Sequence, residues 1–265
     1  MTQDSRGLFS PESMAWRIHS DPSMAVGGVR ALLEQALHPI AMAGVASNSN
    51  FREDAWGRLQ RTGDYVSMLT FGKTEDALAL AARVRKVHAS LKLDDPHLLL
   101  WVHMAMVDSF LDTAVRSGFA ITEAEQDQYI KEMVLFADLV GIPTEKTPTN
   151  RVELAQYFRD IVPELSASDD AKRVALFLTF PPMPKFLRFA TPAAPAWAAL
   201  AILASSALPD WARKLYRVPI LPGDKKAIDL SLRATRRSIS TLPGWVLTPP
   251  QLKMALERWG VAKAS

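Results

Sequence analysis

The 265-residue sequence contains no cysteine. This absence excludes disulfide bonds, iron–sulfur clusters, cysteine zinc sites and any cofactor held through a thiolate or a thioether link. A metal ion bound by this chain must therefore take its ligands from histidine, carboxylate or tyrosine side chains.

No excess of one charge marks the chain. Its 31 basic residues are scattered among 28 acidic ones and leave a formal net charge of +3. A nucleic-acid-binding protein usually gathers its basic residues into a patch or stripe, so nucleic acid is not an expected partner.

Long apolar runs are also scarce. The longest uncharged run, residues 189–208, is interrupted by Pro192 and Pro195 and is rich in alanine, which favours a buried helix over a transmembrane segment. Residues 1–10 include Asp4 and Arg6 and lack the apolar core of a signal peptide. We therefore expect a cytoplasmic protein without a transmembrane segment.

Several catalytic motifs are missing. The sequence has no glycine-rich phosphate loop, no His-Glu-x-x-His helix and no Gly-x-Ser-x-Gly elbow, so the common nucleotide-binding, zinc-protease and α/β-hydrolase classes lack their defining parts. A Glu-x-x-His pair is absent as well, which argues against a di-iron helical bundle.

Helical periodicity is present almost everywhere, and no stretch alternates with the period of a strand. Capping residues followed by an acid or proline predict helix starts near residues 20, 74, 94, 122 and 168, while Gly72, Gly118 and Gly141 predict helix ends. These signals predict an all-α fold of about ten helices, forming a single domain over residues 1–265.

One helix, expected from about residue 54 to residue 70, carries a polar stripe. Positions i, i+3, i+4 and i+7 of this stripe are Arg58, Arg61, Thr62 and Tyr65. Such a stripe can aim two cations and a hydroxyl at one point. The alternative is a solvated face whose arginines pair with neighbouring aspartates.

The histidines offer the main candidates for a metal ligand. His88 shares an apolar helix face with Ala77, Ala81, Val84 and Leu91, so its imidazole is either hydrogen-bonded in the core or bound to a metal ion. His103 lies in an apolar run and is the second ligand candidate.

Four further residues have weaker signals. His19 and His38 are candidates for core hydrogen-bond donors or cofactor contacts, and Arg17 is grouped with them because it lies two residues before His19. His97 follows Pro96 at a helix start and is expected to be exposed.

The order of several motifs resembles the MpaB and rubber oxygenase family. These motifs are SPESMAWRIHSDP (residues 10–22), GGVRALL (27–33), LHPIAMAGV (37–45), WGRLQRT (56–62), TFG (70–72), RVRKVH (83–88) and DPHLLLWVH (95–103). The resemblance is strong over residues 10–143 and looser, through LPDWAR (208–213), to about residue 243.

Membership of this family would imply an all-helical protein that encloses haem b and oxidises an apolar organic compound, such as an isoprenoid-like molecule or a hydrophobic natural product, with dioxygen. By resemblance, His88 corresponds to the proximal iron ligand. The remaining cofactor-binding candidates are Arg58, His103, Arg17, His19 and His38, and the catalytic candidates are Arg61, Thr62 and Arg58.

Two departures from the family pattern affect the expected chemistry. Arg61 stands where the latex-clearing branch has a distal lysine, and a guanidinium stays protonated and does not ligate iron. Arg61 would instead stabilise negative charge on bound oxygen. The connection between His88 and Asp94 is shorter than is common in the family, so the pocket mouth is expected to differ.

Two alternatives to a dioxygen-dependent oxygenase remain open. A haem peroxidase or peroxygenase would use peroxide, and the arginine at position 61 suits such chemistry because it can assist oxygen–oxygen cleavage. A helical carrier of apolar ligands would bind without catalysis. The sequence leaves the oligomeric state open, with a homo-oligomer among the options.

Overall fold

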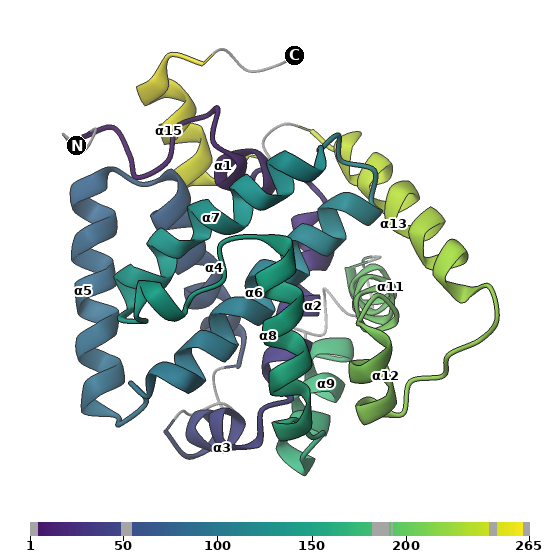
Figure 1. Cartoon of the computed structure of the whole chain (residues 1–265). Coiled ribbons are helices and arrows are strands. Elements are labelled where there is room, and N and C mark those ends of the chain that lie inside the picture. The colour runs from purple at the N-terminus through teal and green to yellow at the C-terminus, as the bar shows by residue number, and fades with distance from the viewer. Residues whose placement is uncertain (1–4, 49–54, 182–190, 192, 244–247, 262–265) are drawn as a thin grey trace.

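The computed structural model describes residues 5–48, 55–181, 191, 193–243 and 248–261 (Figure 1). Within these ranges every regular element is a helix, which confirms the predicted all-α fold. In chain order the elements are α1 (Met14–His19), α2 (Met24–Gln35), α3 (Pro39–Asn48), α4 (Ala55–Phe71), α5 (Thr74–Ser90), α6 (Pro96–Arg116), α7 (Glu123–Val140), η1 (Thr144–Lys146), α8 (Arg151–Ile161), η2 (Val162–Glu164), α9 (Asp169–Thr179), α11 (Ala193–Ser206), α12 (Asp210–Tyr216), α13 (Asp224–Ser240) and α15 (Pro250–Trp259).

The described ranges contain thirteen α-helices, more than the ten or so expected. The surplus comes from short helices such as α1, with 6 residues, and α12, with 7. Helices of one or two turns are too short to show a repeated apolar period, so the sequence pattern does not separate them from loops.

The helix boundaries follow the local signals in the sequence. The Thr122 hydroxyl accepts from the backbone N–H of Glu125 while the Glu125 carboxylate accepts from that of Thr122, which completes a capping box on α7. The Asp95 side chain caps α6 directly before Pro96. Gly141 ends α7 with a φ of 98°, a left-handed conformation that glycine adopts without a side-chain clash.

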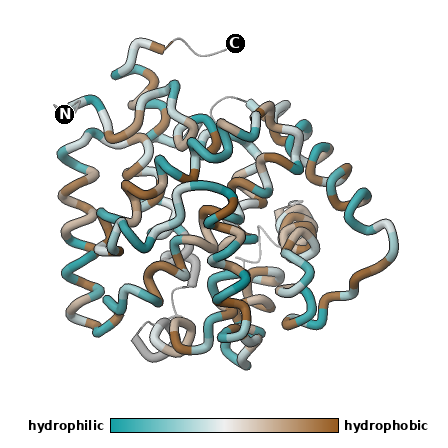
Figure 2. The backbone as a smooth tube through the Cα atoms, in the orientation of Figure 1, coloured by the Kyte–Doolittle hydropathy of each residue, from teal (hydrophilic) through white to brown (hydrophobic). Residues whose placement is uncertain are grey.

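Helix α6 crosses the middle of the molecule (Figure 1). It packs most extensively against α2 and also contacts α1, α7 and α13. The outer helices α5 and α13 carry both polar and apolar residues in successive turns (Figure 2), as expected for helices with one side in solvent.

Helix α6 is also the one described helix whose length and apolar composition would allow it to cross a membrane. Most of this helix is buried inside the protein. The central helix of a protein core can be equally long and apolar, so these properties of α6 are only weak evidence for a membrane-spanning segment.

The alanine-rich segment forms helix α11 but is less buried than its composition predicts. Ala201 and Ala204 face the core, whereas Ile202 on the opposite side is 53% exposed. Burial is incomplete because α11 lies at the surface of the bundle and packs against α2, α9 and α13 on one side. The preceding residues 182–190 and Pro192 lie outside the described part of the chain.

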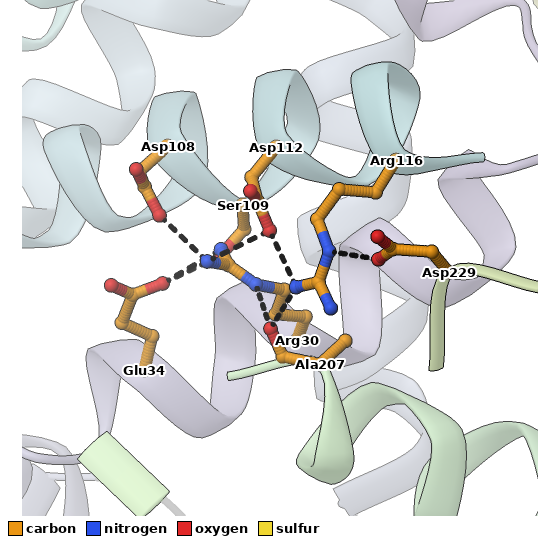
Figure 3. A network of polar contacts seen from close by, with 8 residues as sticks. All are labelled: Arg30, Glu34, Asp108, Ser109, Asp112, Arg116, Ala207 and Asp229. Carbon is orange, nitrogen blue, oxygen red and sulfur yellow. Dashed lines mark hydrogen bonds and ion pairs between the residues drawn. The ribbon is translucent and has the colours of Figure 1, made fainter. Parts of the chain in front are cut away.

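A charged network joins α2 to α6 inside the protein (Figure 3). The guanidinium of Arg30 donates to Glu34 at 3.0 Å and to Asp108 at 2.8 Å, and it also donates to the Ser109 hydroxyl at 2.6 Å. The Ser109 hydroxyl in turn donates to Glu34 at 2.8 Å. Arg30 and Glu34 are almost completely buried.

The same network reaches the C-terminal helices. Arg116 donates to Asp112 at 3.1 Å, to the Ala207 carbonyl at 2.8 Å and to Asp229 on α13 at 2.7 Å. The Ala207 carbonyl also accepts from Arg30 at 3.3 Å. Two arginines therefore hold α2, α6, α13 and the end of α11 together.

Burial raises the pKa of Glu34 to about 8, against the neighbouring Arg30, which lowers it. Removing one member of a buried charged set leaves the others without compensation, and this costs more than the intact set contributes. We expect Arg30→Met to lower the free energy of unfolding by about 3 to 5 kcal/mol, measured by denaturant titration with circular dichroism.

Arg159→Ala serves as the control because Arg159 is exposed and, among the described residues, bonds only to Gln156 on its own helix. Its effect should stay within about 0.5 kcal/mol. The double variant Arg30→Met/Glu34→Leu should be more stable than Arg30→Met. A double variant less stable than the single one would show that the Glu34 carboxyl, left without its arginine partner, is not the source of the loss.

Candidate functional site

His88 lies on the inner side of α5. Ala77 and Ala81 on the same stripe are buried, and Val84 and His88 are half-buried. The Nδ1 atom of His88 is shielded from solvent. The apolar face expected around His88 is thus present, and it turns the imidazole toward the interior of the bundle.

Helices α4 and α5 form an antiparallel hairpin that turns at Gly72 and Lys73. In such a pair, residues equally far from the turn lie beside each other. His88 is therefore level with about Gly57 of α4, roughly one helical turn from Arg61. The hairpin brings the predicted polar stripe and the predicted iron ligand to one end of the two helices.

The polar stripe of α4 changes character along its length. Arg61 and Thr62 are exposed, whereas Tyr65 is half-buried and packs against the core. Burial raises the pKa of Tyr65 to about 12, so its hydroxyl stays protonated at neutral pH. The side chain of Arg58 lies outside the described residues. The exposure of Arg61 and Thr62 suits both an open site and a solvated face.

A second polar group lies in the core, around His19. Its Nδ1 is 2.7 Å from the Thr70 hydroxyl on α4, and its Nε2 is 3.0 Å from the Tyr129 hydroxyl on α7. Burial, and then the nearby imidazole of His103, lower the pKa of His19 to about 3. His19 is therefore a neutral imidazole, fixed at both nitrogens by hydroxyls from two other helices.

His103 is the second neutral imidazole of this group. It is 6% exposed, and burial lowers its pKa to about 4, while a hydrogen bond with the backbone of Met133 acts in the opposite direction. Its Nε2 is buried and has no hydrogen-bond partner among the described residues. A buried nitrogen in this state retains the capacity to bind a ligand or cofactor group.

The other two cofactor candidates lie elsewhere. Arg17 forms an ion pair with Glu125 at 2.8 Å and lies over the ring of Phe119. His38 faces His97 and Glu164 at the start of α6. The structure thus brings His19 and His103 together but does not gather all the cofactor candidates into one place.

Two surface hollows stand out in the described structure. One, of about 450 Å³, is lined by residues that include Arg17, Asp21 and Arg236. The other, of about 560 Å³, lies beside the network of Arg30 and Arg116. Neither is lined by His88, and residues 49–54, close in sequence to the polar end of α4, lie outside the described chain.

Sequence reasoning missed the partners Thr70 and Tyr129 and the buried network around Arg30. No local pattern links His19 to Tyr129, which lies 110 residues away. A signal for the network does exist, since Arg30 and Glu34, and also Asp112 and Arg116, are i,i+4 pairs of opposite charge on helices with apolar surroundings.

The fold and these groups define an all-helical protein that holds neutral imidazoles in an apolar interior. A profile of the family described as ER-bound oxygenase mpaB/B'/rubber oxygenase, catalytic domain, matches residues 16–241. The chain therefore belongs to this oxygenase family, as its sequence resemblance predicts, and is an oxidoreductase of the oxygenase type. Searches of curated proteins and of solved structures found no match.

The low pKa of His103 makes the stability of the protein depend on pH. An unfolded histidine takes up a proton near pH 6.5, whereas His103 in the folded protein does so only near its pKa of about 4. The part of the unfolding free energy that depends on His103 staying neutral is fully present above pH 6.5 and is lost as the pH falls toward about 4. At about pH 5 the loss should be about 2 kcal/mol of unfolding free energy.

The measurement is a series of denaturant titrations from about pH 8 to about pH 5 on the wild type and on His103→Gln. The variant should show a shallower loss on acidification, by about 2 kcal/mol, while above about pH 7.5 the difference between the two proteins should be constant. Identical pH profiles over the whole range would contradict the assignment of a neutral, buried His103.

Proposed function

We propose that the chain is a haem b-dependent oxygenase that acts on an apolar organic substrate with dioxygen, and that His88 is the axial ligand of the iron. The position of His88 carries the proposal. Two observations support it: the chain belongs to this oxygenase family, and His88 is the histidine on the inner side of α5.

The residues present fit a haem group. A neutral imidazole is a suitable axial ligand, and without cysteine the haem would be bound without a covalent link. Ala77 and Ala81 are buried on the stripe that leads to His88, and an apolar surrounding of this kind is what a porphyrin ring needs. Haem iron supplies the redox chemistry that side chains cannot perform with dioxygen.

The polar stripe of α4 suits the opposite side of this site. The positive guanidinium of Arg61 can stabilise negative charge as it develops on oxygen. Thr62, next to it, offers a hydroxyl that can donate or accept a hydrogen bond. Arg58 is suited to bind a haem propionate through two parallel hydrogen bonds.

Apolar groups determine the class of substrate in this proposal. The surfaces that α5 and α6 turn inward are mainly apolar, with alanine, leucine, valine, methionine and two aromatic side chains, Trp101 and Phe110. Such walls exclude water and bind hydrocarbon by the hydrophobic effect. Isoprenoid-like compounds and hydrophobic natural products are therefore the substrates to screen first.

Arg61 also favours a second candidate function, that of a haem peroxidase or peroxygenase. A fixed positive charge can assist cleavage of an oxygen–oxygen bond in peroxide. Product formation from the same substrate should be compared under dioxygen alone and with added hydrogen peroxide. If product forms only with added peroxide, the oxygenase proposal would be wrong and the protein would be a peroxidase or peroxygenase.

Protein purified from haem-supplied cells should contain one haem b per chain, and His88→Ala should lose most of it, because the axial bond is removed. A pyridine haemochrome assay measures haem content, and the Soret band reports ligation. Lys86→Ala, an exposed position on the same helix, is the control and should retain the haem of the wild type.

His103→Ala completes this test, since His103 is the other candidate ligand. If His103→Ala loses haem and His88→Ala keeps a normal Soret band, the axial ligand is His103 and the assignment of His88 is wrong. A colourless wild-type protein that still binds apolar ligands would instead indicate a carrier and would overturn the haem proposal.

Arg61→Ala should leave haem content unchanged and lower turnover by about a hundredfold or more, the scale observed when a positioned charge-stabilising group is removed. The assay is product formation with an apolar substrate on which the wild type is active. Arg61→Lys is the companion variant because an amine, unlike a guanidinium, can lose its proton and bind iron.

Full activity in Arg61→Ala would place Arg61 on a solvated face and remove it from the site. The same conclusion would follow if Arg61→Lys changed neither the visible spectrum nor the rate.

A further inference from the structure

Three side chains with metal-binding atoms meet at a place that the proposed haem chemistry does not use. His38 follows α2, His97 lies in the first turn of α6, and Glu164 ends η2. One donor atom from each lies within 4.8 Å of the other two. Three segments that are distant in sequence therefore direct a possible ligand set to one point.

The distances suit a single small cation. The Nε2 of His97 is 2.9 Å from an oxygen of Glu164, and the Nε2 of His38 is 3.7 Å from the same oxygen. Ligands about 2.0 to 2.2 Å from a tetrahedral zinc ion lie roughly 3.3 to 3.6 Å from one another. These two separations bracket this range, and the donor atoms of His38 and His97 lie within 4.8 Å of each other, so side-chain adjustments of about 1 Å would bring all three to one ion.

The Nε2 of His38 is the observation that points to a ligand. His38 is 2% exposed, and this nitrogen is shielded from solvent and has no hydrogen-bond partner among the described residues. At 3.7 Å, Glu164 is too far for a hydrogen bond. A buried polar atom without a partner is costly, and a metal ion would satisfy it.

The backbone around the three residues is held in place. The N–H of Ser166 donates to the carbonyl of Leu37 at 2.8 Å, which ties the segment after Glu164 to the one before His38. The carboxylate of Asp95 accepts from the N–H of His97 at 2.8 Å. The site would be formed before the metal binds, which lowers the cost of ordering its ligands.

The Nδ1 of His38 accepts a long hydrogen bond, at 3.4 Å, from the N–H of Ala41. Binding a cation through Nε2 requires the proton of the neutral ring to lie on Nδ1. Binding of the cation would therefore break this weak hydrogen bond and form a bond between Nε2 and the metal. The lost hydrogen bond is weak, so its loss costs little.

We propose that His38, His97 and Glu164 bind one divalent cation of the zinc class. Two imidazoles and one carboxylate are ligands that Zn²⁺ accepts, and three protein ligands leave a position for water. His97 is 51% exposed and Glu164 49%, so the ion can enter from solvent. Bound there, it would join the end of α2, the start of α6 and η2.

The proposal does not depend on haem, and the test uses protein without an affinity tag that carries whatever haem it was purified with. The protein is treated with a chelator, which is then removed, and is titrated with Zn²⁺ alone in a calorimeter. One Zn²⁺ per chain should bind, and the thermal unfolding temperature should rise because the ion binds the folded state. Zinc-edge X-ray absorption should show imidazole ligands.

The informative variants are His97→Asn and Glu164→Gln, because both residues are largely exposed and their replacement should not prevent folding. Each should weaken Zn²⁺ binding by about tenfold or more. Glu145→Gln is the matched control, an exposed carboxylate on η1 outside the cluster, and should bind Zn²⁺ as the wild type does. His38→Asn should also lose binding.

The proposal is overturned if the wild type binds no stoichiometric Zn²⁺. It is also overturned if both His97→Asn and Glu164→Gln bind Zn²⁺ as tightly as the wild type, or if the absorption spectrum shows no imidazole.

Discussion

The buried guanidinium of Arg30 is the constraint on which the packing of the core depends. A charge in the interior loses its hydration and must be surrounded by compensating groups. Glu34, Ser109 and Asp108 supply these groups from α2 and α6. The two helices can therefore slide past each other only by breaking several charged hydrogen bonds, so the network sets their relative register.

Because α6 is fixed in this way, the residues along it are fixed as well. Its first turn holds His97 beside His38 and Glu164, and its middle places His103 in the core near His19. Its last turn carries Arg116, which ties it to α13. One rigid helix thus connects the proposed cation site, the neutral imidazoles and the charged network.

The α4–α5 hairpin is held by different contacts. α4 packs against α1 and α15, and α5 packs against α7. Thr70, near the turn of this hairpin, reaches His19. His88 lies toward the opposite end, level with the polar stripe of α4. The imidazoles of the core and the proposed iron ligand are therefore positioned by separate parts of the fold.

By itself, the sequence determined what depends on neighbours along the chain. The Thr122–Glu125 capping box, the Asp95 cap and the left-handed Gly141 were predictable because each acts within one or two helical turns. The apolar stripe around His88 was predictable for the same reason, since helical periodicity alone sets which residues share a face.

Only the tertiary structure decided which helices meet. It paired His19 with Tyr129, and His38 with His97 and Glu164, contacts that join residues 59 to 126 positions apart. From the sequence, His38 could only be placed among the cofactor candidates, because the residues around a histidine in the sequence do not show which distant residues it contacts. Such contacts arise from the packing of whole helices, and the burial of a few charged groups such as Arg30 selects one packing among many.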